Sequence, residues 1–339
     1  MVKSVSVIGA GSWGTALALL LARNGHRVML WGHDAGHMAV LQQDRSNQHY
    51  LPGFAFPDTL TVTADLAEAV NASPILLIVV PSHAFRDLLP KLQTQLPARP
   101  KIAWATKGLE CRSSKLLHEV VAEILGPATP AAVLSGPTFA GEVAKNLPTA
   151  ITVASQDHAF AQELAGLLHN PHFRAYTTDD VIGVQLGGAT KNVLAIAAGV
   201  ADGLGFAANA RAALITRGLA EMMRLGLALG GRPETLMGLA GVGDLILTCT
   251  DNQSRNRRFG LGLGQGLTRE EVVAQIGQEI EGVVTASVVH QLAKTHGLDM
   301  PITEQVYRIL NEGLSPREAV QNLLLREQKP EAGFTGNGD

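Results

Sequence analysis

The stretch VSVIGAGSWGTALALLLARNGHRVMLWGHD, residues 5–34, decides the fold of the first half of the chain. An apolar strand at 4–8 runs directly into a glycine-rich turn, which is followed by a helical pattern over 12–24 and by a second apolar strand at 27–31. A strand, a crossover helix and a second, parallel strand are the parts of a βαβ unit. The sequence therefore predicts an α/β fold from its first residues onward.

The turn GAGSWG, residues 9–14, has the spacing G-x-G-x-x-G. Gly9 permits a tight turn, Gly11 lets the backbone approach a pyrophosphate, and Gly14 allows the helix to pack closely on the strand. The N-terminus of the helix favours an anion, because its free N–H groups and its dipole both point outward there. Since the turn lies between a predicted strand and a predicted helix, we interpret it as a dinucleotide-binding loop rather than as a merely structural turn.

Strand-like runs alternate with helical patterns through the first half of the chain. They lie at 4–8, 27–31, 60–63, 75–80, 101–106, 131–135, 149–154 and 173–178. Continuous apolar strands separated by helices are typical of a parallel sheet that is covered on both faces. After Asp180 the strand signal stops and the apolar spacing becomes helical. We therefore expect a doubly wound α/β domain over 1–183, an all-α domain over 184–330 and a flexible tail at 331–339.

Composition and charge exclude several classes of protein. The 339 residues carry a formal net charge of −3, which argues against a nucleic-acid partner or an anionic membrane surface. Two cysteines, Cys111 and Cys249, suit a reducing compartment rather than a disulfide framework. A strand that begins almost at Met1 leaves no room for a signal peptide, and Lys191 and several glycines make the apolar run 181–201 a poor membrane span. We therefore expect a cytoplasmic protein without a membrane span.

The residues after the second strand bear on the choice between NAD and NADP. An acidic residue that binds the ribose of NAD is expected where this strand ends, but the chain has Trp31 and Gly32 there, and Asp34 follows only later. His33 could donate a hydrogen bond to a 2′-phosphate; the alternative is a solvated loop histidine. We therefore expect NADP to be accepted alongside NAD, with NADPH used at least as well as NADH.

Two lysines are candidates for chemistry. Lys191 is the only charged residue between 181 and 201. Burial would lower its pKa from about 10.4, by as much as ~3–5 units, into the range where a lysine exchanges protons near neutrality. The alternative is a lysine that extends to the surface. Lys107 follows the strand at 101–106, at the carboxyl edge of the sheet where ligands bind in such folds, and its alternative is a surface loop lysine.

Polar residues also gather at two further places. Asp244 stands among apolar neighbours, and a serine, an asparagine and three arginines follow it: Ser254, Arg255, Asn256, Arg257 and Arg258. Such a cluster suits a phosphate monoester, since arginine donates in a fork; the alternative is a solvated basic loop. In the stretch 134–143, Gly136 and Thr138 precede a helix start that offers N–H groups to an anion. No ligand spacing points to a metal site.

Nine motifs carry a more specific pattern. They are GAGSWGTALA, WGHD, VVPSHAF, WATKGLE, SGPTFA, GVQLGGATKNVLAIAAG, NARAALITRGLAEM, GVGDLILTCTDNQSRNRRFG and PITEQVY. Together they resemble the bacterial NAD(P)-dependent sn-glycerol-3-phosphate dehydrogenase family, from Val5 to about Ala319. The resemblance implies a Rossmann domain followed by a helical domain like that of 6-phosphogluconate dehydrogenase. It also implies interconversion of dihydroxyacetone phosphate and sn-glycerol 3-phosphate for glycerophospholipid synthesis, and we expect a homodimer.

The resemblance also assigns roles to single residues. It implies that Lys191 is the general acid toward the ketone, and the base in reverse, with Asp244 beside it and Lys107 near both cofactor and substrate. The implied substrate residues are Lys107, Gly136, Thr138, Lys191, Asp244, Ser254, Arg255 and Asn256. The implied cofactor residues are Gly9, Gly11, Ser12, Trp13, Gly14, His33, Lys107, Ala140, Arg255 and Glu281. Trp13 replaces the tyrosine or phenylalanine of some relatives, and the stretch around Glu281 is less closely matched.

Two rival functions stay open at this point. A β-hydroxyacid or ketopantoate reductase-like dehydrogenase would share the two-domain plan, but such enzymes act on carboxylates and have little use for the cluster at 254–258. A non-catalytic NAD(P)H-binding redox sensor would need the glycine loop but not Lys191 and Asp244 in apolar stretches. Turnover with dihydroxyacetone phosphate and with 2-ketoacids separates these functions.

Overall fold

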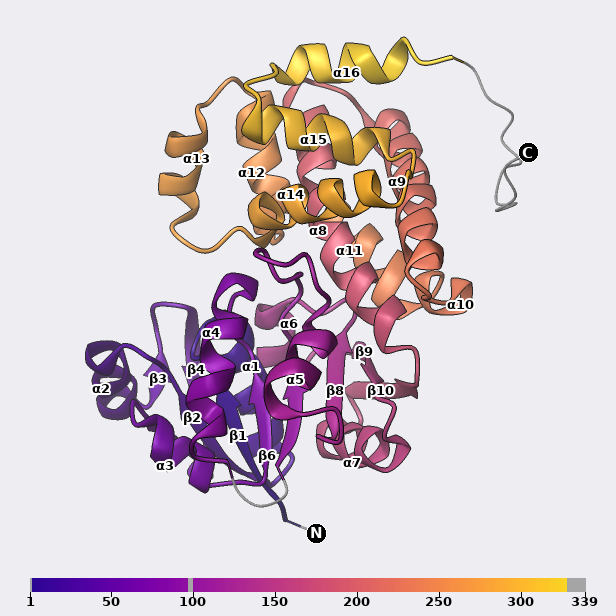
Figure 1. Ribbon diagram of the computed structural model, residues 1–339. Coiled ribbons are helices and arrows are strands. Elements are labelled where there is room, and N and C mark those ends of the chain that lie inside the picture. Colours follow the sequence, from indigo (N-terminus) through magenta and orange to yellow (C-terminus); the bar gives the residue numbers. More distant parts are fainter. Residues whose placement is uncertain (1, 97–99, 328–339) are drawn as a thin grey trace.

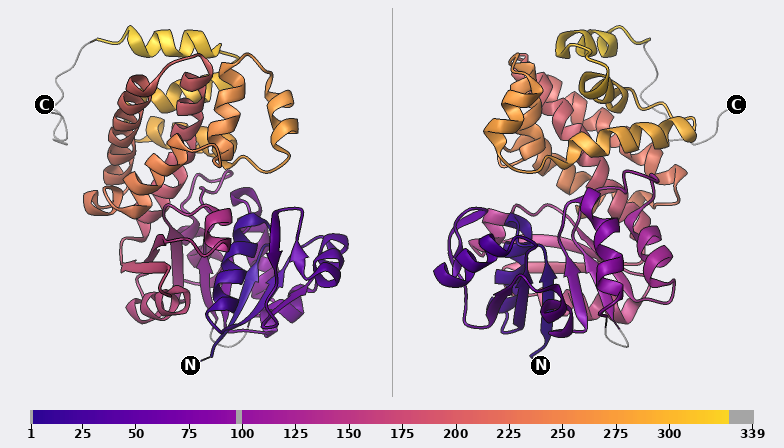
Figure 2. Two further views of the ribbon diagram at one scale, coloured as in Figure 1. Left: turned by 180° about the vertical axis from the view of Figure 1, so that it is seen from behind. Right: turned by 60° about the vertical axis from the view of Figure 1, so that its left-hand side comes forward.

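The computed structural model describes residues 2–96 and 100–327, and the tail expected at 331–339 lies outside them. A sheet with its covering helices forms one half of the molecule, and helices alone form the other half (Figure 1). The sheet ends with β10 (Phe173–Thr178), and the helical half begins with α8 (Val181–Gly203). The same two halves are distinct from behind and from the side (Figure 2).

The main sheet has the strand order β10-β9-β8-β7-β6-β1-β2-β5. The strands are β1 (Ser4–Ile8), β2 (Arg27–Trp31), β5 (Leu60–Thr63), β6 (Ile75–Ile78), β7 (Lys101–Trp104), β8 (Ala131–Ser135), β9 (Thr149–Ala154) and β10. Each strand expected from the sequence is present. β1 pairs with β2 on one side and with β6 on the other, so the order of the strands reverses at β1. The sheet is therefore doubly wound, as expected.

One pair corrects the expectation of a wholly parallel sheet. β8 and β9 are antiparallel, whereas the other neighbours in this sheet pair in parallel. Their connection, residues 136–148, contains only the short helix α6 (Ala140–Ala144), and it reverses the direction of the chain instead of crossing the sheet. Sequence patterns cannot detect this, because a strand buried on both faces has the same apolar pattern in either direction.

Helices cover both faces of the sheet. α1 (Ser12–Arg23) and α7 (His158–Leu168) pack in one apolar cluster with Val5 and Val7 of β1. The other face carries α3 (Leu66–Asn71), α4 (Ser82–Gln93) and α5 (Leu117–Leu125), which pack with Ile8 in a second cluster. The alternation of side chains along β1 therefore divides the core into two layers.

A small hairpin that the sequence did not predict lies beside α1 and α2 (Ala35–Asp44). Its strands are β3 (Ser46–Asn47) and β4 (Leu51–Ala55), which form a separate antiparallel sheet. Strands this short fall below the length at which alternation is readable.

The helical half is built around α8. Its other helices are α9 (Ala208–Ala228), α10 (Pro233–Leu236), α11 (Asp244–Thr250), α12 (Arg255–Gly264), α13 (Arg269–Ile276), α14 (Glu281–Thr295), α15 (Pro301–Asn311) and α16 (Pro316–Leu324), with a π-helical turn at Leu239–Gly243. Among the described residues, α8 is the one helix long and apolar enough to cross a membrane, and 94% of that apolar window is buried inside the protein. The surrounding helices therefore account for its apolar sequence.

Glycines let α8 and α12 approach until their backbones touch. A Cβ atom at Gly199 of α8 would lie 2.0 Å from the carbonyl oxygen of Arg257, and one at Gly260 of α12 would lie 2.0 Å from the carbonyl oxygen of Ile196. No larger residue fits at either position without moving a helix. The helix that carries Lys191 is thus in direct backbone contact with the helix that begins at Arg255.

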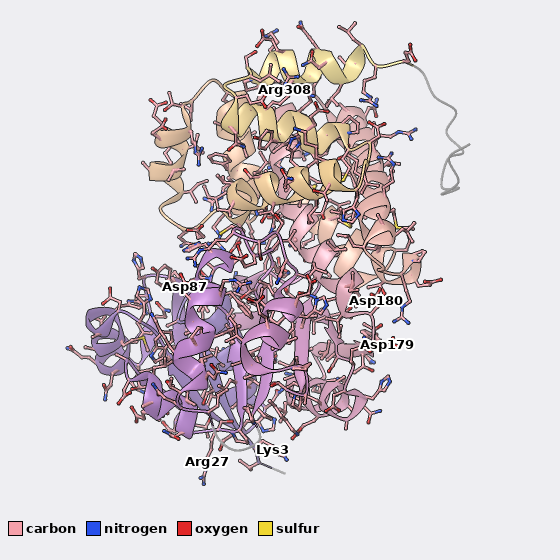
Figure 3. The ribbon with its side chains drawn as sticks, in the orientation of Figure 1. Lys3, Arg27, Asp87, Asp179, Asp180 and Arg308 are labelled. Carbon is pink, nitrogen blue, oxygen red and sulfur yellow. The ribbon has the colours of Figure 1, made fainter. Side chains whose placement is uncertain are left out.

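The chain passes between the halves at Asp179 and Asp180, which lie at their junction (Figure 3). The carboxylate of Asp180 accepts hydrogen bonds from the backbone N–H groups of Gly183 (2.8 Å) and Arg232 (2.9 Å). It therefore caps α8 and ties its start to the segment that precedes α10.

Candidate active site

The glycine loop has the geometry that a dinucleotide requires. Gly9 has φ +128°, and a Cβ atom there would lie 2.5 Å from the carbonyl oxygen of Val79. At Gly14 a Cβ atom would lie 1.8 Å from the carbonyl oxygen of Gly9, whereas at Gly11 it would meet nothing within 4 Å. Gly9 and Gly14 thus allow close packing, and the open space at Gly11 fits the approach of a pyrophosphate.

The hairpin β3–β4 contacts the glycine loop and supports it. The sequence did not predict this contact. The Oγ of Ser12 donates to the carbonyl oxygen of Tyr50 (2.7 Å). The amide nitrogen of Asn47 donates to the carbonyl oxygen of Ala10 (2.9 Å) and to the Oγ1 of Thr15 (2.8 Å). Trp13 is partly buried against the apolar cluster under α1. Asn47 is fully buried, so its two hydrogen bonds hold the loop without competition from water.

β2 ends at Trp31, as the sequence predicted. His33 is exposed, and the carboxylate of Asp34 caps α2 by accepting from the backbone N–H of His37 (3.0 Å). A side chain at Gly32 would lie 2.5 Å from the sulfur of Met38, so a carboxylate cannot occupy that position without displacing Met38. The carboxylate that follows β2 is therefore engaged with the helix backbone.

A carboxylate between two lysines forms the centre of the site. The Nζ of Lys191 lies 2.6 Å from Oδ1 of Asp244, and the Nζ of Lys107 lies 2.8 Å from Oδ2. The Lys191 Nζ also donates to the Oγ1 of Thr248 (2.9 Å), and the Lys107 Nζ donates to the carbonyl oxygen of Gly136 (2.8 Å). Thr138 lies at the limit of hydrogen bonding, 3.5 Å from the Lys107 Nζ. The three charged groups therefore act as one unit.

Burial and charge oppose each other in this unit. Burial lowers the pKa of Lys191 to about 8, although Asp244 opposes this change. Burial alone would raise the pKa of Asp244, but Lys107 and Lys191 hold it below its usual value. Lys191 is thus buried rather than extended to the surface, as the first of its two interpretations required. A lysine with this pKa exists in both protonation states close to neutral pH.

The residues expected to form one phosphate cluster point in different directions. Ser254 is the N-cap of α12, and Arg255 lies half-buried and donates to the Oε1 of Gln278 (3.4 Å). Arg257 is buried in an ion pair with Asp202, and Arg258 is exposed. The expectation that all three arginines act together is therefore wrong. The run is the first turn of a helix, in which successive side chains diverge by about 100°.

Asn256 and Glu281 lie at the contact between the two halves. The amide nitrogen of Asn256 donates to Oδ1 of Asn192 (2.9 Å), whose own amide nitrogen donates to the carbonyl oxygen of Lys107 (3.1 Å). The Glu281 carboxylate accepts from the N–H (2.9 Å) and the Oγ (2.6 Å) of Ser82. Hydrogen bonds thus connect the Lys107 loop with the helical half.

Sequence reasoning missed three of these residues, and their signals differ. Thr248 follows Asp244 by one helical turn, a spacing that places both on one face. Asn192 adjoins Lys191 in the same apolar run. Ser82 belongs to a motif of the family resemblance, VVPSHAF, to which no role was assigned. Ala140, an expected cofactor residue, begins α6 and packs on the cluster under α1.

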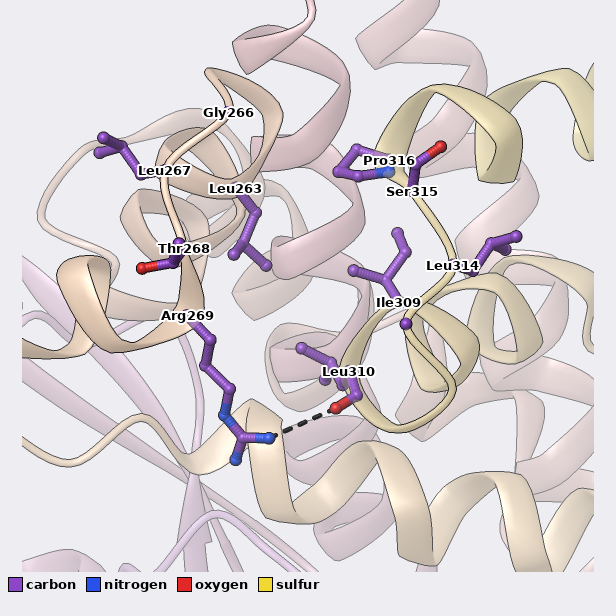
Figure 4. Close-up of a pocket in the computed structure, with 11 residues that line it drawn as sticks. Leu263, Gly266, Leu267, Thr268, Arg269, Ile309, Leu310, Leu314, Ser315 and Pro316 are labelled. Carbon is purple, nitrogen blue, oxygen red and sulfur yellow. Dashed lines mark hydrogen bonds between the residues drawn. The ribbon is translucent and has the colours of Figure 1, made fainter.

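A hollow in the helical half lies away from this site. Its volume is about 480 Å³, and it lies between the α12–α13 and α15–α16 connections, with Leu263, Leu310 and Pro316 among its lining residues (Figure 4). Arg269 crosses it to donate to the carbonyl oxygen of Leu310 (3.3 Å). None of the predicted site residues lines it. Across residues 2–96 and 100–327, no group of three or more His, Cys, Asp or Glu side chains is placed to hold a metal.

Comparison with models of protein families shows which family the chain belongs to. A family model described as the NAD-dependent glycerol-3-phosphate dehydrogenase N-terminus matches residues 4–161, and its C-terminal counterpart matches residues 180–321. The chain belongs to the NAD-dependent glycerol-3-phosphate dehydrogenase family. The expected resemblance is thereby confirmed, together with a Rossmann-type domain followed by an all-α domain.

Individual members of the dehydrogenase family are similar along almost the whole chain. A relative from Methylococcus capsulatus named glycerol-3-phosphate dehydrogenase (NAD(P)+) is 64% identical over 328 residues, which are 96% of this chain and 98% of the relative. A relative of the same name from Pseudoalteromonas translucida is 58% identical over 330 residues, or 97% of this chain and 98% of its own. The crystal structure of glycerol-3-phosphate dehydrogenase from Coxiella burnetii is similar with a TM-score of 0.94 at 53% identity, covering 96% of this chain and 99% of that one.

More distant structures share only the architecture. A ketopantoate reductase from Ralstonia eutropha is similar with a TM-score of 0.59 at 14% identity, covering 94% of this chain and 99% of that one. This likeness shows the fold alone. The first rival function therefore rests on architecture, whereas the dehydrogenase family is supported by sequence.

Proposed function

We propose that the chain reduces dihydroxyacetone phosphate reversibly to sn-glycerol 3-phosphate with NADPH or NADH, and so supplies glycerophospholipid synthesis. The observation that carries this proposal is the Lys107–Asp244–Lys191 unit at the contact between the two halves of a chain of this family. A redox sensor without turnover would have no use for a buried lysine and a partly buried lysine on one buried carboxylate, because such charges are costly to bury.

The nicotinamide, when bound, supplies the hydride to the ketone carbon. Lys191 donates the proton from Nζ to the oxygen that becomes an alkoxide, and accepts it in the reverse reaction. Asp244 orients both ammonium groups, and Lys107 adds a second positive charge beside that oxygen. These charges stabilise the transition state more than the neutral ketone, and this difference accelerates the step.

The remaining site residues bind and orient. In this proposal Gly136, Thr138, Ser254, Arg255 and Asn256 hold the substrate, with Arg255 on the phosphate. The phosphate does not react, so its binding energy serves to position the carbonyl group. The cofactor lies along the glycine loop in contact with a second group of residues, which the proposal takes to be Gly9, Gly11, Ser12, Trp13, Gly14, His33, Lys107, Ala140, Arg255 and Glu281.

Further parts of the proposal concern organisation. We assign the cofactor domain to 1–183 and the substrate domain to 184–330, a division supported by the end of the sheet at Thr178. We also propose that the protein is a cytoplasmic homodimer without a nucleic-acid partner, and that it uses NADPH at least as well as NADH. The absence of a carboxylate at Gly32 supports the last point, since no side chain there repels a 2′-phosphate.

Oxidation of NADPH and NADH, followed spectrophotometrically with three ketones, tests the proposal. Dihydroxyacetone phosphate should turn over, dihydroxyacetone poorly and a 2-ketoacid not at all. Arg255→Ala should raise KM for the phosphorylated ketone about tenfold to a hundredfold, as loss of one charge-assisted hydrogen bond predicts. Arg258→Ala is the matched control, because Arg258 is exposed on the same helical turn. Turnover of 2-ketoacids alone would contradict the proposal.

A further inference from the structure

Glu281 and Ser82 form a contact between the two halves of the molecule. Ser82 is the first residue of α4, and Glu281 is the first residue of α14. Ser82 donates to both oxygens of the carboxylate, from its N–H to Oε1 (2.9 Å) and from its Oγ to Oε2 (2.6 Å). A Cβ atom at Gly108 would lie 2.5 Å from the Cβ of Ser82 and 3.0 Å from Oε2 of Glu281. The carboxylate is thus enclosed between α4 and the residue after Lys107.

Arg255 and Glu281 each precede a residue of one direct contact: the N–H of Gly282 donates to Oδ1 of Asn256 (2.9 Å). Burial lowers the pKa of Arg255, and Glu281 opposes this effect more than any other charge. Arg255 nevertheless forms no ion pair with any described residue, and its guanidinium donates a hydrogen bond to the Oε1 of Gln278 (3.4 Å). A partly buried guanidinium ordinarily pairs with a neighbouring carboxylate. Here that carboxylate is occupied by Ser82.

We propose that Ser82 is a positioning residue that holds the Glu281 carboxylate away from Arg255, so that the guanidinium stays available for the substrate phosphate. The inference rests on the proposed function, which assigns the phosphate to Arg255. Without the hydroxyl of Ser82, Oε2 of Glu281 loses its 2.6 Å donor in an enclosed place. Leaving a buried acceptor without a partner is costly, and Arg255 supplies the replacement. Phosphate then competes with an internal carboxylate for the same cation.

The charges around Glu281 give this competition a pH dependence. Burial raises the pKa of Glu281, and Glu279 on its own segment adds to the increase. His83 of α4 opposes it, and lies with its Nδ1 3.7 Å from Oε1 of Glu279; Arg255 of α12 completes the charged surroundings. Protonation at low pH makes Glu281 neutral. A neutral carboxyl group no longer competes with phosphate for Arg255.

A double-mutant cycle tests the inference. Ser82→Ala is measured in the wild type and in the Glu281→Gln background, with KM and kcat for dihydroxyacetone phosphate and for unphosphorylated dihydroxyacetone. At pH 8, Ser82→Ala should raise KM for the phosphorylated ketone about tenfold in the wild type, and less than about twofold in the Glu281→Gln background. kcat and the KM for dihydroxyacetone should change less than about twofold. The tenfold factor should shrink as the pH is lowered, because burial raises the pKa of Glu281.

Equal factors in both backgrounds, or equal losses with both ketones, would show that Ser82 acts through folding and would overturn the inference. Ser82→Cys keeps the shape of the side chain, although its thiol is larger and donates only weakly, so it should give an intermediate KM. It replaces Ser82→Ala where that variant does not fold. A wild type that reduces no phosphorylated ketone contradicts the proposed function instead. In that case the same cycle, read as binding of inorganic phosphate by calorimetry, still tests whether Ser82 keeps Arg255 available.

Discussion

Two buried carboxylates have pKa values that are shifted in opposite directions. They are Asp244 at the junction of the halves and Glu221 within the helical half. Each residue is about 1% exposed. Asp244 contacts two ammonium groups, whereas Glu221 accepts from neutral donors at the start of α15: the N–H of Ile302 (2.5 Å), and the N–H (3.0 Å) and Oγ1 (2.8 Å) of Thr303. The pKa of Asp244 lies below its usual value, while burial raises the pKa of Glu221 to about 7.

The difference shows how the partners of a buried carboxylate set the direction in which its pKa changes. Neutral N–H and O–H donors satisfy the oxygens of Glu221, but they do not offset the loss of hydration of a full charge. Two lysines do offset it at Asp244, and the same arrangement leaves Lys191 with a pKa of about 8. A carboxylate buried among cations thus stays ionised beside a lysine of lowered pKa, whereas a carboxylate buried among neutral donors connects two helices.

The largest expected effect comes from removing Lys191, which carries the proton in the proposed mechanism. Lys191→Ala should lower kcat by at least ~100-fold, the low end for general acid–base catalysis. Cofactor affinity, measured by quenching of protein fluorescence, should stay nearly unchanged. Lys145→Ala, at an exposed lysine, is the control. Retained turnover in a folded Lys191→Ala variant would remove Lys191 from the mechanism.

Substitution of the structural carboxylate, Glu221, should change the stability of the protein rather than its turnover rate. The folded protein holds a proton on Glu221 up to about pH 7, whereas the unfolded chain releases it near 4.5. Its contribution is therefore fully present below pH 4.5 and is lost as pH rises through 7, on the order of 3 kcal/mol in total. Glu221→Gln should flatten this part of the pH dependence of the unfolding free energy, measured with urea. Glu318→Gln, at an exposed capping carboxylate, should leave it unchanged. An equal pH dependence in wild type and Glu221→Gln would contradict the raised pKa.

The pH dependence of turnover tests how Asp244 affects the pKa of Lys191. In the proposed mechanism ketone reduction needs protonated Lys191, so its kcat/KM should fall about tenfold per unit above pH 8, whereas glycerol phosphate oxidation, which needs the neutral amine, should rise up to about pH 8 and then level off. Asp244→Asn removes the charge that opposes the lowered pKa of Lys191 and leaves Lys107 in place. The falling limb should then move to lower pH. A limb that does not move in this variant would show that another group titrates.

A third carboxylate, Asp34, separates capping from burial. It caps α2 as Glu221 caps α15, but it is exposed, and its hydrogen bond from the N–H of His37 holds its pKa below the usual value. Asparagine caps helices equally well, so Asp34→Asn should leave the thermal midpoint unchanged. It removes a negative charge near His33, so kcat/KM for NADPH relative to NADH should rise a few-fold. An unchanged ratio would place the 2′-phosphate away from this turn.

The sequence predicted each strand of the main sheet and the glycine loop, because both depend on local pattern. Apolar runs and glycine spacing are visible along the chain. The apolar run around Lys191 left two interpretations open, burial or extension to the surface, and the structure shows burial. The direction of β9 was not visible, since it depends on how residues 136–148 turn. The hairpin β3–β4 was too short to recognise.

Site geometry was less predictable where it joins distant segments. That Lys107 and Lys191 share one carboxylate follows from the docking of the two halves, which no local pattern records. The divergence of Arg255, Arg257 and Arg258 could be derived only once their run was known to be helical. Ser82 gave no signal of its own, because its importance comes from Glu281, far along the chain.

The backbone contact between α8 and α12 governs how the site can move. With no side chains between Gly199 and Gly260 and the facing carbonyls, neither helix can slide or roll on the other. Lys191 and Asn256 therefore travel on one rigid piece, and Asp244 travels with them through its contact with Lys191. Lys107 belongs to the other half. A rotation of one half against the other would therefore change the distance from Lys107 to Asp244, together with the Asn192–Lys107 and Ser82–Glu281 hydrogen bonds, whereas the Lys191–Asp244 pair would keep its geometry.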